Sequence, residues 1–200
     1  MLALVMAIVA QDAEALPNGA RLAAGEACYL IADTRSGQAR PLGRTYQRID
    51  RETVGGREVL RILVHQEVQN GAFRMRDRFV LDAGTMLPIE FESRRNGEPH
   101  VTLTWSADGI SGERHGPDGA SEAVSLPLTS PVWEGNLWGL HFAALPISDG
   151  ARFALPFWQY DKGFGVFSIT VKGSRIVNRR LTGTPYRRAI GTPSWGSGLR

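Results

Sequence analysis

Residues 60–79 read LRILVHQEVQNGAFRMRDRF, two runs of largely alternating side chains around one turn. Alternation with a period of two is typical of a strand whose two faces meet different surroundings. Asn70-Gly71 predicts a two-residue hairpin turn, because both residues tolerate positive φ. A turn there places Val68 opposite Phe73 and Ile62 opposite Phe79, so that the apolar side chains of both strands share one face. The segment therefore predicts an antiparallel β-hairpin.

The pattern continues into two further strands. Pairing Phe79 with Ile89 and Asp77 with Phe91 keeps the apolar residues of the next strand on the same side. A tight turn at 96–97 would mix the two faces of the strand after it, whereas pairing Phe91 with Leu103 keeps them apart. The sequence therefore predicts a longer or bulged loop over residues 96–98, despite the Asn-Gly pair.

The opposite face carries three alternating arginines, Arg74, Arg76 and Arg78. In the predicted register they meet the acidic side chains Glu90 and Glu92. This pattern favours a solvent-exposed face with cross-strand ion pairs, because the carboxylates neutralise the arginines. The alternative interpretation is an anion-binding stripe.

The rest of the chain is typical of a β protein. It has 23 glycines and 11 prolines among 200 residues, and many short segments are separated by turn signals. Residues 133–145 fit a short helix that Pro146 ends. The predicted fold class is mainly β, a curved antiparallel sheet or open barrel packed around one short helix. We expect a linker over 16–26, the antiparallel β domain over 27–181 and a disordered basic tail over 182–200.

The first fifteen residues are similar to a signal peptide. Leu2 to Ala10 is an apolar run too short to span a bilayer, and Ala13-Glu14-Ala15 fits a small-x-small cleavage site. We therefore expect a signal peptide over 1–15 and a periplasmic or cell-envelope location. Cys28 is the only cysteine, so no internal disulfide can form.

The charge is unevenly distributed along the chain. Residues 172–200 hold seven of the 23 basic residues and no acidic ones, which leaves 16 basic against 20 acidic residues before them. The basic tail predicts at most peripheral contact with an anionic membrane surface. An exported protein with an acidic body is not expected to bind nucleic acid.

Motifs of known chemistry are missing from the sequence. It holds no nucleophile elbow, no phosphate loop and no dinucleotide fingerprint. The four histidines are scattered, so the sequence predicts no metal site, no cofactor and no catalytic residue. Ser111, His115 and Asp118 lie close together in the sequence, but in a turn-rich stretch typical of a solvated loop. The sequence leaves open whether the protein is an enzyme and favours a non-enzymatic role.

The shared apolar face is the best candidate for binding. It is mostly apolar with a few polar anchors, the usual composition of a small-molecule site. The candidate ligand-binding residues are Gln66, Asp77, Ser93, Phe91, Trp105 and Trp138. The alternative is that the polar residues lie where the sheet opens to water and that the aromatic residues are ordinary core.

Three classes of function remain open. The favoured one is a protein that binds a lipid or other apolar ligand, or an envelope partner protein, in the concavity of the sheet. The others are a hydrolase with a non-obvious site and a structural or assembly factor that uses an exposed sheet edge.

Two short stretches resemble a known family. Residues 79–88, FVLDAGTMLP, have a strand that ends in Asp followed by a turn and Leu-Pro, and residues 137–146 end in Ala-Leu-Pro. Both are similar to elements of an exported bacterial family, domain of unknown function 3108 (DUF3108), over about residues 27–177. The resemblance implies a curved sheet wrapped around a helix, of the shape of lipoprotein-carrier folds, in the cell envelope. It implies no reaction. In this family a further strand hairpin usually follows, where this chain has its basic tail.

Overall fold

The computed structural model describes residues 16–35, 37–116, 118–176 and 187–189. Eight strands form one antiparallel sheet in which every strand pairs with its neighbours in the sequence. These strands are β1 (Gly25–Asp33), β2 (Arg40–Val54), β3 (Arg57–Val68), β4 (Phe73–Asp82), β5 (Pro88–Arg95), β6 (Glu98–Trp105), β7 (Gly109–His115) and β8 (Ser121–Pro127). The sheet does not close on itself, because β1 and β8 form its two edges. The mainly β fold with an open curved sheet is therefore confirmed.

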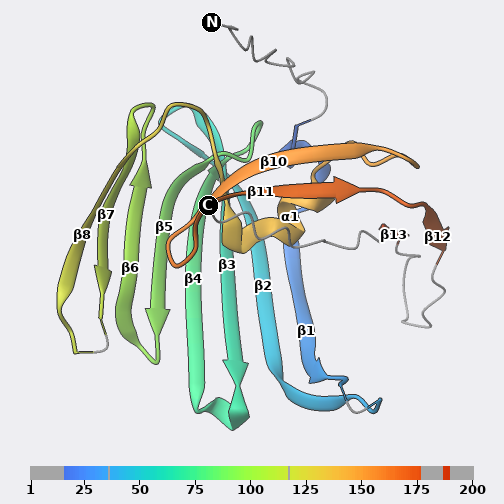
Figure 1. Cartoon of the computed structure of the whole chain (residues 1–200), viewed down its shortest axis with the longest axis horizontal. Coiled ribbons are helices and arrows are strands. Elements are labelled where there is room, and N and C mark those ends of the chain that lie inside the picture. Colours follow the sequence, from blue (N-terminus) through green and yellow to red (C-terminus); the bar gives the residue numbers. More distant parts are fainter. Residues whose placement is uncertain (1–15, 36, 117, 177–186, 190–200) are drawn as a thin grey trace, which may run out of the picture.

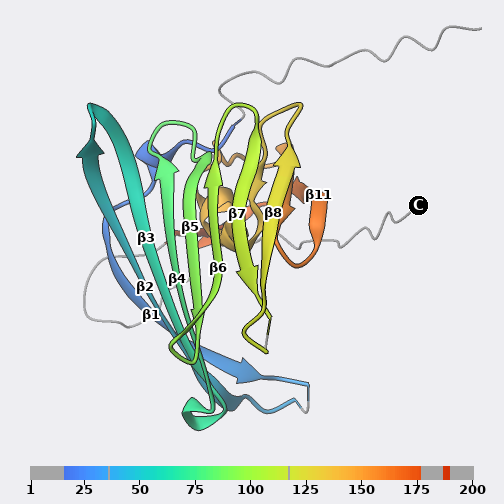
Figure 2. The same ribbon diagram turned by 90° about the vertical axis from the view of Figure 1, so that its left-hand side faces the viewer.

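A second, smaller layer covers part of the concave face. It contains a three-stranded sheet of β9 (Trp133–Glu134), β10 (Arg152–Gln159) and β11 (Gly163–Thr170) and the helix α1 (Trp138–Ala143). Figure 1 shows β10, β11 and α1 within the curve of the large sheet, across the upper part of its strands. In Figure 2 the strands stand in front of α1, so that the uncovered convex face is turned to the viewer.

The hairpin of β3 and β4 has the predicted register. Val68 pairs with Phe73 and Ile62 pairs with Phe79. Asn70 and Gly71 adopt φ values of 56° and 87°, and the Ala72 amide donates a hydrogen bond to the Gln69 carbonyl at 3.2 Å. The turn therefore forms where positive φ is easily adopted.

The predicted register of β4 with β5 is wrong by two residues. Phe79 pairs with Phe91 rather than Ile89, and Asp77 pairs with Ser93 rather than Phe91. A wider turn, in which the Asp82 amide bonds the Leu87 carbonyl and Met86 adopts a φ of 58°, accounts for one residue of the shift. A bulge between Val80 and Leu81 accounts for the other. A shift of two residues keeps each side chain on its predicted face. It does change the ion pairs, since Arg78 now meets Glu92.

The pairing of β5 with β6 is as predicted, with Phe91 opposite Leu103. A bulge is also present, but it lies within the strands. The register shifts between Ser93 and Arg94, while Arg95 pairs with Glu98 around a tight turn at 96–97. The Asn-Gly pair thus forms its usual turn, and the extra residue is absorbed by the adjacent strand.

The helix is shorter than the predicted span of 133–145. Residues 133–134 form β9, a 3-10 turn follows over Gly135–Leu137, and only Trp138–Ala143 is α-helical. The Glu134 side chain accepts hydrogen bonds from the Asn136 and Leu137 amides and so caps the 3-10 turn. The predicted helix is therefore correct only from Trp138 onward. Residues 133–134 belong to β9, which pairs in parallel with β10, and the Glu134 cap separates that strand from the helical segment.

The two ends of the domain differ from a simple linker and tail. Within the expected linker 16–26, a 3-10 turn forms over Gly19–Arg21, Gly19 is buried, and the Asn18 amide bonds the Ala144 carbonyl. Within the basic tail, β13 (Arg187–Ala189) pairs with β12 (Ser174–Ile176). The predicted signal peptide 1–15 and the rest of the tail lie outside the described residues.

The core lies between the two layers. The large sheet contributes mainly the alternate residues of β3 to β6, and the smaller layer contributes apolar side chains of β9, β10, β11 and α1's flanks. Its buried members include Ile62, Phe79, Phe91, Leu103, Trp133, Leu137, Leu155, Trp158 and Phe167. Within the described part of the chain, no helix has the length and apolar character that crossing a membrane requires.

Candidate functional site

The concave face is organised in rows of directly paired residues that run across the strands. One row joins Ile49, Ile62, Phe79, Phe91 and Leu103, and we call it the Phe79 row. The next row, the Asp77 row, joins Gln47, Val64, Asp77, Ser93 and Val101. The third, the Tyr29 row, joins Tyr29, Thr45, Gln66, Met75 and Arg95. Burial decreases from the first of these rows to the third.

The Phe79 row is filled by side chains. Phe79 stacks on Phe91 with ring centroids 4.8 Å apart, and Phe91 stacks on Tyr160 of the covering layer at 5.8 Å. Trp105 meets Trp158 edge to face at 6.1 Å. Every member of this row is buried. This part of the concave face is therefore packed core.

The Asp77 row marks the transition from core to solvent. Asp77 and Ser93 are 4% and 1% exposed, whereas Gln47 and Val64 in the same row are half-buried. Within the described structure, neither Asp77 Oδ1 nor Ser93 Oγ has a hydrogen-bond partner. Burial raises the pKa of Asp77 to about 6, and Ser93 and the Arg95 guanidinium oppose that rise. Asp77 and Ser93 are thus placed together, but inside the protein.

A second buried acid lies in the covering layer. Glu134 is completely desolvated, and its carboxylate accepts bonds from the Asn136 amide at 2.7 Å and the Leu137 amide at 3.2 Å. Burial raises the pKa of Glu134 to about 8, the Asn136 hydrogen bonds oppose this, and the charge of Asp77 adds to it. The charge of Asp77 therefore affects the ionisation of Glu134 across the two layers.

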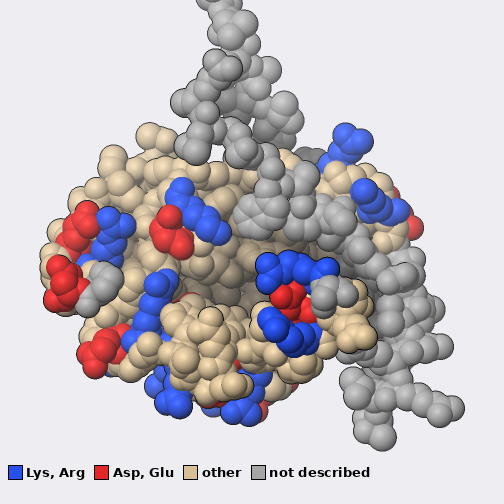
Figure 3. Space-filling view, turned by 60° about the horizontal axis from the view of Figure 1, so that its bottom comes forward, with Lys and Arg blue, Asp and Glu red and all other residues tan. Residues whose placement is uncertain are grey.

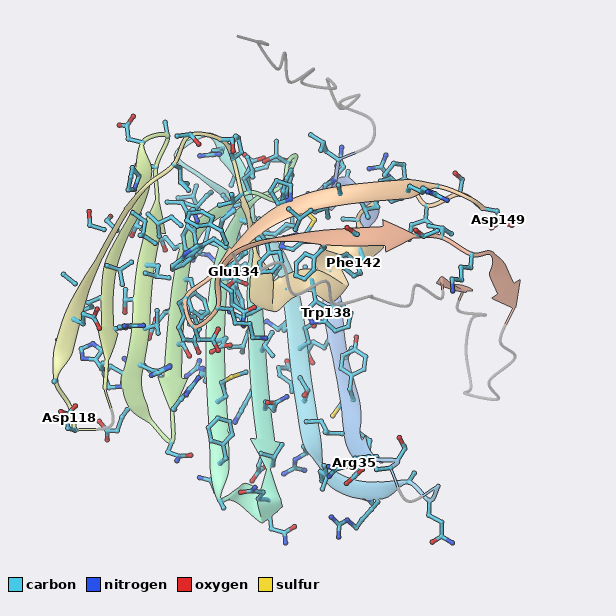
Figure 4. All side chains as sticks on the ribbon, in the orientation of Figure 1. Arg35, Asp118, Glu134, Trp138, Phe142 and Asp149 are labelled. Atoms are coloured by element: carbon cyan, nitrogen blue, oxygen red, sulfur yellow. The ribbon has the colours of Figure 1, made fainter. Side chains whose placement is uncertain are left out.

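Next to Glu134 is an equally buried histidine. His141 Nε2 lies 3.0 Å from the backbone carbonyl oxygen of Glu134, which only accepts hydrogen bonds, so that Nε2 carries the proton. Burial lowers the pKa of His141 to about 4, and the imidazole is neutral at physiological pH. Figure 4 shows Glu134 at the start of the segment that leads into α1.

The Tyr29 row ends on β5 at a cationic residue, Arg95. Arg95 Nη2 donates a hydrogen bond to the Tyr160 hydroxyl at 2.7 Å, and the His100 ring packs edge to face on Tyr160. Arg95 Nε and His100 Nε2 are buried without a partner within the described residues. A depression of about 430 Å³ opens here, and Arg95, His100, His115, Tyr160 and Asp161 are among its lining residues.

The Tyr29 row is the accessible part of the face. Tyr29 is 52% exposed, and Thr45, Gln66 and Met75 are half-buried. Gln66 Nε2 donates a hydrogen bond to Thr45 Oγ1 at 3.2 Å. On α1, Trp138 is 47% exposed, and Figure 4 places it on the side of the helix that faces the uncovered lower part of the strands. Figure 3, seen from that end, shows the molecule hollowed there. We call this region the open groove.

The six candidate residues are therefore divided among three environments. Gln66 lines the open groove, and Trp138 of α1 borders it from the covering layer. Asp77, Ser93 and Phe91 are on the predicted face but buried. Trp105 packs against Trp158 and borders a separate depression of about 520 Å³ near Leu87 and Val132. The structure does not gather all six around one cavity.

The residues Ser111, His115 and Asp118 are not brought together by any contact in the described structure. Asp118 Oδ1 accepts from the Ala120 amide within its own loop. His115 Nε2 instead lies 3.4 Å from Glu113, whose other oxygen accepts from Ser121 at 3.0 Å. The Glu113 carboxylate thus lies between the Ser121 hydroxyl and the His115 imidazole. His115 is therefore not placed to take a proton from Ser121. Among the described residues, no group of three or more His, Cys, Asp or Glu side chains could hold a metal ion.

Sequence reasoning missed Arg95, Glu134, His141 and Tyr160. Glu134 carried a weak signal, since an acidic residue directly before a helical stretch is a common cap. Alternation with Phe91 and Ser93 places Arg95 on the concave face, so its position could have been predicted from the strand pattern. Tyr160 and His141 enter the site through the packing of the second layer, which the local pattern does not describe.

Comparison with known proteins assigns a family. The sequence profile described as protein of unknown function (DUF3108) matches residues 29–188, which include all strands from β2 to β12 and most of β1 and β13. The match extends into the basic tail, where a departure from the family was expected. Neither a curated protein nor a solved structure matches the chain. The chain belongs to the DUF3108 family, whose function is unknown.

Proposed function

We propose that this protein is a non-enzymatic, exported envelope protein that binds an amphipathic, lipid-like ligand in the open groove. The observation that carries this proposal is the gradient of burial across the three rows. The Phe79 row is buried, the Asp77 row is partly buried, and the Tyr29 row is accessible on a face that is otherwise core. An apolar chain laid along the Tyr29 row would extend the packing of the core toward the open end.

Charge favours a ligand with an acidic head group. The Tyr29 row ends at Arg95, whose Nη2 is fixed by Tyr160 while its Nε has no partner in the described structure. An acidic group there would satisfy the guanidinium, because charge-assisted hydrogen bonds are stronger than neutral ones. The half-buried Met75 next to Arg95 adds a flexible apolar contact.

The envelope location is part of the same proposal. It is supported by the apolar run of residues 2–10 and the small-x-small site at 13–15. A carrier or sensor of lipid-like molecules is of use where such molecules cross an aqueous space.

The test uses 11-(dansylamino)undecanoic acid, a fluorescent chain with a carboxylate, titrated into the full chain. Met75→Glu puts a negative charge into the groove beside Arg95, so we expect the Kd to rise at least about tenfold, equivalent to about 1.4 kcal/mol. Arg95→Gln should remove the preference for the acid over its amide. The matched control is Ser125→Glu, which adds the same charge at an exposed position on the opposite face of the sheet, across from Ser111 on β7.

Two results would contradict the proposal. One is a Kd for Met75→Glu equal to that of the control, and the other is a wild-type protein that binds neither the acid nor its amide. Native mass spectrometry of protein purified from a bacterial envelope gives an independent readout. A mass released on denaturation would support a carrier and identify the class of ligand.

A second candidate function rests on β1. This edge strand has no charged residue between Ala27 and Ala32, and Tyr29 and Leu30 are exposed, at 52% and 70%. A long, uncharged edge can pair with a strand of another protein. In the same mass spectrum, a stable dimer or a bound protein instead of a small molecule would favour this assembly role.

A further inference from the structure

One part of the convex face of the large sheet, over β2 to β5, carries more arginines than carboxylates. Cross-strand neighbours on β2 to β5 bring five arginines together, and we call them the arginine patch: Arg44, Arg74, Arg76, Arg78 and Arg94. The face is the one turned to the viewer in Figure 2, opposite the open groove. It is therefore independent of the proposed function.

Two carboxylates form ion pairs with four of these arginines. Glu67 lies 3.0 Å from Arg44 Nη2 and 3.7 Å from Arg74 Nε. Glu92 lies 2.8 Å from Arg78 Nη1 and 2.9 Å from Arg94 Nε. The exposed Glu90 lies on the same face of β5, next to Glu92. Three negative charges therefore stand against five positive ones, and the patch keeps an excess of two. The ion-paired face expected from the sequence is thus only partly neutralised.

Arg76 is the arginine without a carboxylate. Among the described residues it has no ion pair or hydrogen bond, and its cross-strand neighbours are His65 on one side and Arg94 on the other. Like charges placed directly opposite each other destabilise a sheet. The pairing of Arg76 with Arg94 therefore costs free energy that an anion between them would recover.

There is room for such an anion. A depression of about 560 Å³ lies over the patch, and its charged and imidazole lining residues are His65, Arg74, Arg76, Arg78, Glu92 and Arg94. Glu92 is already paired with Arg78 and Arg94. The turn after β5 closes one end of it. There the Arg74 amide donates to Asn96 Oδ1 at 2.8 Å, and the Asn96 amide donates to the Arg74 carbonyl at 2.8 Å. These bonds tie the backbone of Arg74 to the turn that follows Arg94 and Arg95.

We propose that Arg76 and Arg94 bind a phosphoryl oxyanion in this depression. A guanidinium presents its N–H groups as a rigid fork that matches two oxygens of one phosphoryl group, and two opposed forks can hold one such group. The chemistry is shared by free phosphate and by the head group of an anionic lipid, and binding experiments separate these two sources.

The first experiment titrates inorganic phosphate into the full chain at low salt and follows the Arg Nε–Hε resonances by NMR. We expect the signals of Arg76 and Arg94 to shift together. The double variant Arg76→Gln/Arg94→Gln should raise the Kd about 25-fold, taking about fivefold for each arginine near an anionic group. Both side chains are exposed, so the variant is expected to fold.

The second experiment measures flotation with vesicles of one part phosphatidylglycerol to three parts phosphatidylcholine. The control in both experiments is Arg48→Gln, which removes an exposed arginine of β2 that is paired with Asp50 outside the patch. The control retains the basic tail, so any contribution of the tail to vesicle binding cancels.

Three outcomes are distinguished. A 25-fold loss of phosphate binding with vesicle binding equal to that of the control supports a site for free phosphate. A loss of similar size in vesicle binding supports a lipid head group. If the double variant equals the control in both experiments, Arg76 and Arg94 do not bind a phosphoryl group and the proposal is overturned.

Discussion

At the scale of single residues, three buried ionisable side chains have strongly shifted pKa values. Asp77, Glu134 and His141 are all desolvated, and the acids have raised pKa values while the histidine has a lowered one. Each of them is therefore held in its neutral form more readily than it would be in water. The stability of the fold should depend on pH through these three residues.

Of these three residues, Glu134 contributes most to the change in stability between pH 6.5 and 8. Its folded pKa of about 8 lies above the ordinary 4.5, so the folded state binds more protons and stability falls as the pH rises through this range. His141, through proton uptake in the unfolded state, and Asp77, through its folded pKa of about 6, still contribute near pH 6.5 with opposite signs. Both contributions are common to the wild type and to a Glu134 variant, so a comparison of the two removes them. We expect Glu134→Gln to abolish a decline of up to about 1.4 kcal/mol per pH unit. Urea unfolding at pH 6.5 and 8 measures it.

The exposed variant Glu122→Gln is the control for this prediction, because its carboxylate lies at the surface. If Glu134→Gln and the control show the same slope between pH 6.5 and 8, Glu134 is ionised in the folded protein and the interpretation is wrong.

The residues of the candidate site could be predicted where alternation decides the face. Gln66, Asp77 and Ser93 lie on the concave face as expected, because a strand places every second residue on one side. Whether they are accessible could not be predicted. Their exposure depends on how far the second layer extends along the strands, and that layer is held by distant contacts such as Phe91 with Tyr160.

At the scale of elements, the accuracy of each predicted strand register depended on the turn between the two strands. Asn70-Gly71 forms the tight turn that was predicted. Asn96-Gly97 also forms a tight turn, where a longer or bulged loop over 96–98 was predicted, and the bulge lies within the strands instead. The register after β4 was mispredicted because Met86 adopts a φ of 58°, which its residue type does not indicate, and because a bulge between Val80 and Leu81 adds one residue. Register errors of this kind leave the faces intact but exchange the partners across strands.

Close packing inside the second layer depends on a glycine of β11. A Cβ at Gly165 would lie 2.6 Å from Phe157 Cζ, and Phe157 stacks on Phe167 with ring centroids 4.0 Å apart. Gly165→Ala should therefore lower the free energy of unfolding by about 1–3 kcal/mol, since the ring must shift. Chemical denaturation measures the loss.

Gly139→Ala is the matched control, because a Cβ there meets no atom within 4 Å and the residue lies in α1. This variant should gain about 0.5–1 kcal/mol from helix propensity. Equal effects of the two substitutions would show that the Phe157 contact does not limit the packing of β11.

At the scale of the whole molecule, the aromatic stack of Phe79, Phe91 and Tyr160 joins the large sheet to its covering layer. We expect the two layers to unfold together. Phe91→Ala should lower the free energy of unfolding by about 3–5 kcal/mol. It should shift the transitions seen by far-ultraviolet circular dichroism and by tryptophan fluorescence equally.

Val54→Ala, at an exposed position of β2, should change stability by less than about 0.5 kcal/mol and serves as the control. Should the fluorescence transition of Phe91→Ala separate from the dichroism transition, the layers would be independent folding units and the stack would not couple them.

The simple order of β1 to β8 has a consequence for how the chain folds. Each strand pairs with the strand before it and the strand after it, so the large sheet can grow by one hairpin at a time. Each step closes only a short loop and carries a small entropic cost. The parallel pairing of β9 with β10 spans the intervening helix and comes at a higher cost. The large sheet should therefore form early, with its concave face exposed until the second layer docks.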